Sequence, residues 1–248
     1  MKGEVGRRVF VGSVVAGLPL LAGAGATVAW AQRGTAPRAR DPFLDQLVAE
    51  MKGTVRAFSK SPSGEHARRL SSSLRLLAAW GASSQIDTQV KQALRGAIAR
   101  EGRDAVLWHR PDPVAFRAEA RDLGFDDSSV VPVPTLPAPD AATRQLVLDD
   151  MLAHGVTAQW RKAADALDAA AAALDRRASL QRGAVTLAGQ TDPSVCTQIA
   201  QTLALLNAQM IFWCGPWFVW WFVEGCGLVS AAWLGVYAAN WWLGCPWW

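Results

Sequence analysis

Apolar side chains recur at helical spacing along most of the chain after residue 40, so the pattern predicts a succession of amphipathic helices. Asp41 and Pro42 have the character of a cap and first turn for the first of them. Three apolar faces follow in order: Leu44, Leu47, Val48, Met51, Val55 and Phe58; Leu70, Leu74 and Leu77; and Ile86, Val90, Leu94 and Ile98. The stretches Ser61–Gly64 and Gly81–Ser84 predict loops between these helices.

Three further helices are predicted between residues 113 and 179. A short helix from Pro113 ends at Gly124, and a second runs from a cap at Asp140 to Gly155. Residues 126–139 contain four prolines and predict a linker. The third helix, 157–179, carries a coiled-coil-like seam that is suited to close antiparallel packing: Trp160, Ala164, Leu167, Ala171 and Leu174.

The pattern changes at residue 192. The segment 192–248 holds nine of the thirteen tryptophans, all four cysteines and only two charged residues, Asp192 and Glu224. It predicts a long helix from Asp192, interruptions at Gly215–Pro216 and at Gly225 and Gly227, and a second long run that closes at Gly244. The expected fold is all-α: a helical bundle over 41–183, a linker over 184–191, and a disulfide-stapled, Trp-rich helical hairpin over 192–248.

The first 31 residues have the features of an export signal. Arg7 and Arg8 precede Phe10, an uncharged Gly/Ala-rich core follows, and Ala29 and Ala31 form a small-x-small cleavage pattern. This predicts export by the twin-arginine route with cleavage after Ala31, and a linker over 32–40. The alternative is an N-terminal membrane anchor.

The four cysteines predict disulfides, because an exported chain reaches an oxidising compartment. Two antiparallel helices of nearly equal length would bring Cys196 beside Cys245 and Cys214 beside Cys226. The rival pairing joins Cys196 to Cys226 and Cys214 to Cys245. It requires the middle segment to run back along the whole first helix, about 18 Å against about 27 Å.

The sequence carries no recognisable catalytic pattern. The three histidines are scattered, and no metal-helix, nucleophile-elbow or phosphate-loop motif occurs. A formal net charge of +4 is too small to indicate nucleic acid binding. We therefore expect a non-enzymatic protein without a cofactor or metal ion.

Three interpretations of the apolar segment 192–248 remain open. It is a two-pass transmembrane hairpin of an envelope protein, the core against which the bundle packs, or a stapled peptide that is released and acts on membranes. In the last case its partners are membrane lipid or a membrane receptor, and the bundle shields it by intramolecular contact. The candidate membrane-contacting residues are Trp213, Trp217, Trp220, Trp221, Trp233, Trp241, Trp242, Trp247 and Trp248.

The layout resembles that of halocin-type bacteriocin precursors: a twin-arginine signal, a helical middle region and a small apolar, cysteine-containing C-terminal peptide. The resemblance is carried by the segment from Cys196 to Cys245, including Cys214-Gly215-Pro216 and Cys226-Gly227. It implies that the C-terminal peptide is antimicrobial and that the middle region protects the producing cell. This chain has four cysteines, fewer than that family, and many more tryptophans.

Overall fold

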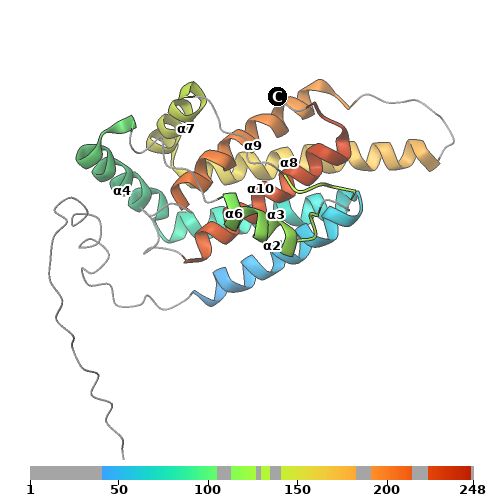
Figure 1. Ribbon diagram of the computed structural model, residues 1–248, viewed down its shortest axis with the longest axis horizontal. Coiled ribbons are helices and arrows are strands. Elements are labelled where there is room, and N and C mark those ends of the chain that lie inside the picture. The colour runs from blue at the N-terminus through green and yellow to red at the C-terminus, as the bar shows by residue number, and fades with distance from the viewer. Residues whose placement is uncertain are drawn as a thin grey trace, which may run out of the picture. The chain divides into compact units, whose positions relative to one another are not determined.

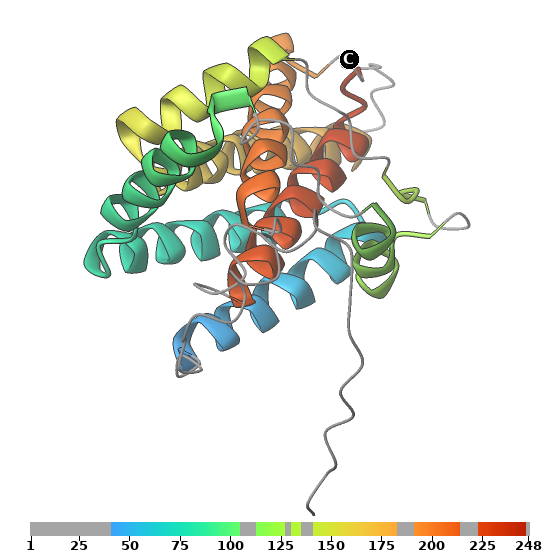
Figure 2. The same cartoon turned by 60° about the vertical axis from the view of Figure 1, so that its left-hand side comes forward.

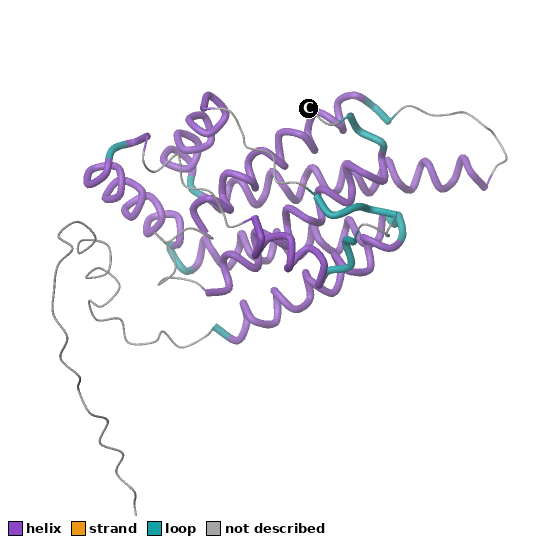
Figure 3. The backbone as a smooth tube through the Cα atoms, in the orientation of Figure 1, coloured by secondary structure: helices purple, strands orange, loops and turns teal. Residues whose placement is uncertain are grey.

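In the computed structural model the described residues are 41–104, 113–126, 130–134, 141–182, 191–213 and 223–246. All regular elements in these ranges are α-helices (Figure 1; Figure 3), which confirms the predicted all-α class. The helices are α2 (Pro42–Lys60), α3 (Gly64–Ser83), α4 (Ile86–Glu101), α6 (Pro113–Asp122), α7 (Ala141–His154), α8 (Val156–Arg182), α9 (Pro193–Trp213) and α10 (Val223–Leu243).

The predicted apolar faces are the faces that the helices bury. Leu44, Leu70, Leu74 and Leu94 are fully inaccessible to solvent, and most of their partners in the three predicted stripes are also buried. Asp41 caps α2 as expected: one carboxylate oxygen accepts a hydrogen bond from the Phe43 backbone N–H at 3.0 Å. The seam of α8, from Trp160 to Leu174, is also buried.

The break predicted over Gly81–Ser84 begins only after Ser83, and the break predicted at Gly225 and Gly227 is wrong. Gly81 lies inside α3, which continues to Ser83, and Gly225 and Gly227 lie inside the first turns of α10. At Gly81 an added Cβ would come within 2.9 Å of side-chain atoms of Thr157, Ile86 and Trp160. Glycine therefore permits close approach there, and it does not end the helix.

Glycine does terminate the helices at three other predicted positions. Gly124, Gly155 and Gly244 follow α6, α7 and α10 with φ angles of +89°, +83° and +66°. This left-handed conformation strains side chains with a Cβ, which is why glycine is frequent just beyond a helix end.

Helices α3 and α8 form the most extensive pairing in the bundle. Alanines such as Ala164 and Ala171 let the two backbones approach closely. Ion pairs line the exposed edge of this contact: Arg68 meets Asp175 at 2.5 Å, and Arg75 meets Asp165 and Asp168 at 2.8 and 2.6 Å. These pairs are solvent-exposed, so they align the helices more than they stabilise them.

Helix α10, in the C-terminal segment, lies within the core of the bundle. The described residues belong to one compact unit, in which α10 contacts α9, α2, α8 and α3 (Figure 1; Figure 2). Thirteen consecutive residues of α10, 228–240, are buried. A helix that is apolar on every face must be surrounded, and here the surrounding material is the rest of the chain.

Candidate functional site

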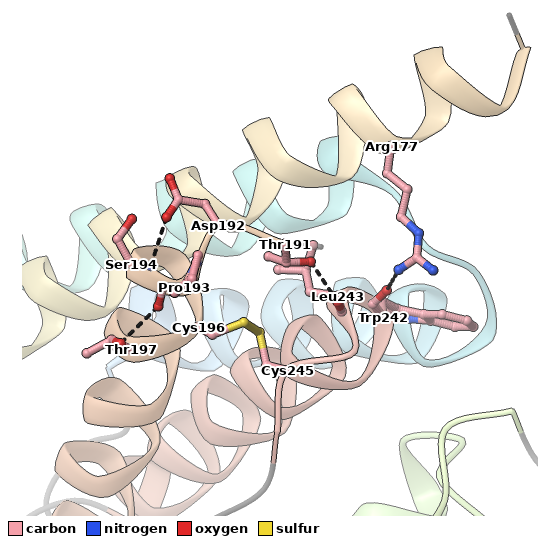
Figure 4. Close-up of a disulfide and its surroundings, with 10 residues drawn as sticks. All are labelled: Arg177, Thr191, Asp192, Pro193, Ser194, Cys196, Thr197, Trp242, Leu243 and Cys245. Carbon is pink, nitrogen blue, oxygen red and sulfur yellow. Dashed lines mark hydrogen bonds between the residues drawn. A yellow bond between two sulfur atoms is a disulfide. The ribbon is translucent and has the colours of Figure 1, made fainter. Parts of the chain in front are cut away.

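The hairpin formed by α9 and α10 belongs to the apolar, cysteine-containing segment of the chain, and a disulfide joins its two ends. Cys196, in the first turn of α9, bonds to Cys245, two residues beyond the end of α10, with a Cα–Cα distance of 5.4 Å (Figure 4). This confirms the predicted pairing of these two residues. Cys214 lies outside the described residues, so the predicted Cys214–Cys226 bridge stays a prediction; no described cysteine is free.

The start of α9 is fixed by its own residues. The Asp192 carboxylate accepts a hydrogen bond from the Ser194 backbone N–H at 2.9 Å (Figure 4). This hydrogen bond holds the pKa of Asp192 below its ordinary value. A carboxylate at a helix N-terminus satisfies an unpaired backbone N–H and faces the positive end of the helix dipole.

The C-terminal end of α10 is held by donors from outside that helix. The Arg177 guanidinium of α8 donates to the Trp242 carbonyl at 2.7 Å, and the Thr191 hydroxyl donates to the Leu243 carbonyl at 2.7 Å (Figure 4). In return, the Trp242 indole N–H donates to the Phe58 carbonyl in the last turn of α2, at 2.8 Å. Carbonyls in a last helical turn lack partners within their helix, so the bundle and hairpin cap each other.

An aromatic cluster joins the middle of α10 to α6 and the segment that follows it. The Trp233 and Tyr237 rings stack at 5.5 Å, and Phe116 meets Trp233 edge-on at 5.4 Å. The Tyr237 hydroxyl donates to the Pro132 carbonyl at 3.1 Å. Burial raises the pKa of Tyr237 to about 12, because a phenolate in this position would lose its hydration.

Trp233, one of the predicted membrane-contacting residues, is buried in the intact chain. Trp233 is 0% exposed, and its indole N–H donates to the Leu203 carbonyl of α9 at 3.2 Å, so the core occupies all of its surface. Trp242 is partly buried, whereas Trp241 is 38% exposed. The remaining candidates lie outside the described residues: Trp217, Trp220, Trp221, Trp247, Trp248 and the side chain of Trp213.

A buried polar chain that was not predicted connects α9 to the bundle. The Trp160 indole N–H donates to Gln209 Oε1 at 3.0 Å, and Gln209 Nε2 donates to Gln159 Oε1. Gln159 Nε2 then donates to the Asp150 carboxylate at 2.9 Å, which Lys162 also contacts at 3.2 Å. Gln209 is 0% and Gln159 1% exposed. One feature of the sequence could have indicated this contact. Gln209 lies three residues after Leu206, and this spacing places it on the buried face of the helix.

The described residues contain neither a candidate metal site nor a candidate membrane-spanning helix. No group of three or more histidine, cysteine, aspartate or glutamate side chains within them is placed to hold a metal ion. Across the same ranges, every helix falls short of the combined length and apolarity that crossing a bilayer demands. The export-signal residues Arg7, Arg8, Phe10, Ala29 and Ala31, and the linkers 32–40 and 184–190, lie outside the described residues.

Comparisons with protein-family models, curated proteins and solved structures found no match to this chain.

Proposed function

We propose that the protein is an exported precursor of a bacteriocin-like membrane-active peptide. The helices of residues 41–182 pack against the apolar hairpin and help to bury α10, and the hairpin, once cut from them, acts on a membrane. The observation that carries the proposal is the burial of residues 228–240 on every face of α10 by helices of the same chain. A segment this apolar needs such a cover to stay in water.

The hairpin is built to survive separation from its cover. Its disulfide joins Cys196 to Cys245, both inside the hairpin, and so fixes the α9–α10 pairing without help from the bundle. The bond from Trp233 to the Leu203 carbonyl also lies within the hairpin. In contrast, the Trp242 indole N–H and the Tyr237 hydroxyl donate hydrogen bonds to the bundle. These two donors lose their partners when the bundle is removed, so they can then bind other acceptors.

Apolar surface is the proposed driving force for membrane binding. The segment 192–248 carries a formal charge of −2, from Asp192 and Glu224 alone, and therefore lacks the attraction to anionic lipid that cationic peptides use. Indole groups favour the membrane interface, so the nine tryptophans supply the affinity.

The test uses the mature full-length chain with residues 184–190 replaced by a protease recognition sequence. We expect no dye release from liposomes by the uncut protein, dye release by the hairpin separated after cutting, and relief of that release when the bundle fragment is added back. Growth inhibition of a panel of microorganisms is measured in parallel. A separated, oxidised hairpin that neither releases dye nor inhibits growth would contradict the proposal and favour a single structural domain with the hairpin as its core.

A further inference from the structure

Gln209 makes a fully buried polar contact across the interface between the hairpin and the bundle. Most of the interface is apolar, and apolar surfaces of similar size tolerate many partners. Gln209 differs from its apolar neighbours because both ends of its amide group are engaged by α8, one by the Trp160 indole and one by the Gln159 amide. The three side chains are 0%, 3% and 1% exposed, respectively.

The direction of the hydrogen bonds gives this contact its selectivity. Trp160 donates to Gln209, Gln209 donates to Gln159, and Gln159 donates to the Asp150 carboxylate. Each donor therefore points toward Asp150, a negatively charged acceptor at the edge of the core. Only a side chain with one acceptor and one donor at the position of Gln209 fits between the indole and the Gln159 carbonyl.

We infer that Gln209 is the specificity-determining residue by which the bundle recognises its own hairpin. Gln159 and Trp160 are the bundle residues that form hydrogen bonds with it. The inference rests on the proposed function, in which the hairpin is cut from the bundle and is then held by contacts alone. An apolar hairpin without this glutamine would leave the buried Gln159 carbonyl without its donor and would remove the acceptor of the Trp160 indole. Unpaired buried polar groups are expensive, so such a hairpin is rejected.

The recognition is separable from the hairpin's own integrity. Gln209 bonds to α8 through both ends of its amide, whereas the disulfide and the Trp233 bond that hold α9 to α10 lie elsewhere in the hairpin. Replacing Gln209 by leucine is therefore expected to weaken the bundle–hairpin contact and leave the stapled hairpin intact. Leucine is also more favourable than glutamine in lipid.

The experiment uses the full-length chain that carries the protease sequence in place of residues 184–190. After cutting, separation of the two fragments is followed by size-exclusion chromatography across a series of urea concentrations. The variants are Gln209→Leu and Trp160→Phe, which removes the indole donor. The matched control is Gln201→Leu, the same substitution at an exposed position of the same helix.

We expect Gln209→Leu to weaken the cut complex roughly tenfold to a hundredfold, the range for losing buried hydrogen-bond partners. Trp160→Phe should weaken it in the same direction, and Gln201→Leu should leave it within about twofold of the unmodified chain. In a double-mutant cycle with Gln159→Leu, the two losses should be clearly less than additive, because the residues share a bond.

Two results would overturn the inference: a Gln209→Leu complex as tight as the control, or an unmodified complex that separates on cutting without urea. Dye release by the separated hairpin reports on the proposed function independently. If no separated hairpin releases dye but Gln209→Leu still weakens the complex, the membrane activity fails and the recognition stands. If the separated hairpin releases dye but all complexes are equally tight, the membrane activity stands and the recognition by Gln209 fails.

Discussion

At the scale of single residues, polar groups inside the apolar core determine how the hairpin is held. Gln209, Tyr237 and Trp242 each place a hydrogen-bonding group against a bundle acceptor or donor. Their apolar parts fill the core, and their polar parts fix position, as amphipathic side chains do at interfaces. Sequence patterns revealed none of these partners, because a single uncharged polar residue in an apolar run does not indicate which distant residue it meets.

Tyr237 gives a direct optical test of this burial, because it is the only tyrosine in the chain. The tyrosinate absorbance of the native protein should appear with a midpoint near pH 12, against about 10 in denaturant. Between these values the unfolded chain loses the phenolic proton and the folded chain keeps it. The contribution of Tyr237 is therefore complete below about pH 10 and is lost as the pH rises toward 12, by at most about 3 kcal/mol.

The control is Tyr237→Phe, which should lack both the absorbance change and this part of the loss of stability with pH. A tyrosinate signal near pH 10 while the helical circular dichroism is intact would mean that Tyr237 is exposed to solvent.

At the scale of helices, most of the fold could be predicted because burial follows the 3.6-residue period. The stripes that begin at Leu44, Leu70 and Ile86 are buried as expected. The nearly equal lengths of the two helices predicted in 192–248 led to the correct pairing of Cys196 with Cys245. The errors at Gly81, Gly225 and Gly227 are of one kind, because the pattern predicts a break at a glycine that lies inside a helix. Glycine ends helices and also permits close packing, and the pattern along one helix does not show what lies opposite.

Two glycines of α10 illustrate this difference. A Cβ at Gly235 would lie 2.6 Å from Leu70 Cδ1, a fully buried atom of α3, whereas the nearest atom to a Cβ at Gly227 is 3.7 Å away. Gly227→Ala should stabilise the protein by up to about 1 kcal/mol through helix propensity. Gly235→Leu should destabilise it by about 1–3 kcal/mol through overpacking.

Urea denaturation followed by circular dichroism measures both changes. Adding Leu70→Ala to Gly235→Leu should recover part of the loss, since it clears the space that the new side chain enters. A Gly235→Leu variant as stable as the unmodified protein would show that α10 does not approach α3 closely at Gly235.

At the scale of the whole molecule, the disulfide and the burial of α10 act on different states. The Cys196–Cys245 bond closes a loop with a sequence separation of 49, which by the chain-entropy model stabilises the folded chain by about 4 kcal/mol. Replacing both cysteines by serine should lower the free energy of unfolding by about this amount in urea titrations. Reduction of the unmodified protein should lower its free energy of unfolding by the same amount. An unchanged urea midpoint would contradict the stabilising role of the disulfide.

The position of that bond also affects how the hairpin withstands degradation. Because the disulfide links the first turn of α9 to a residue beyond α10, any single backbone cleavage between Cys196 and Cys245 leaves two pieces joined by a covalent bond. A protease must cut twice before any part of that loop is lost. If the hairpin is released outside the cell as proposed, the disulfide keeps its two helices together after the first cut.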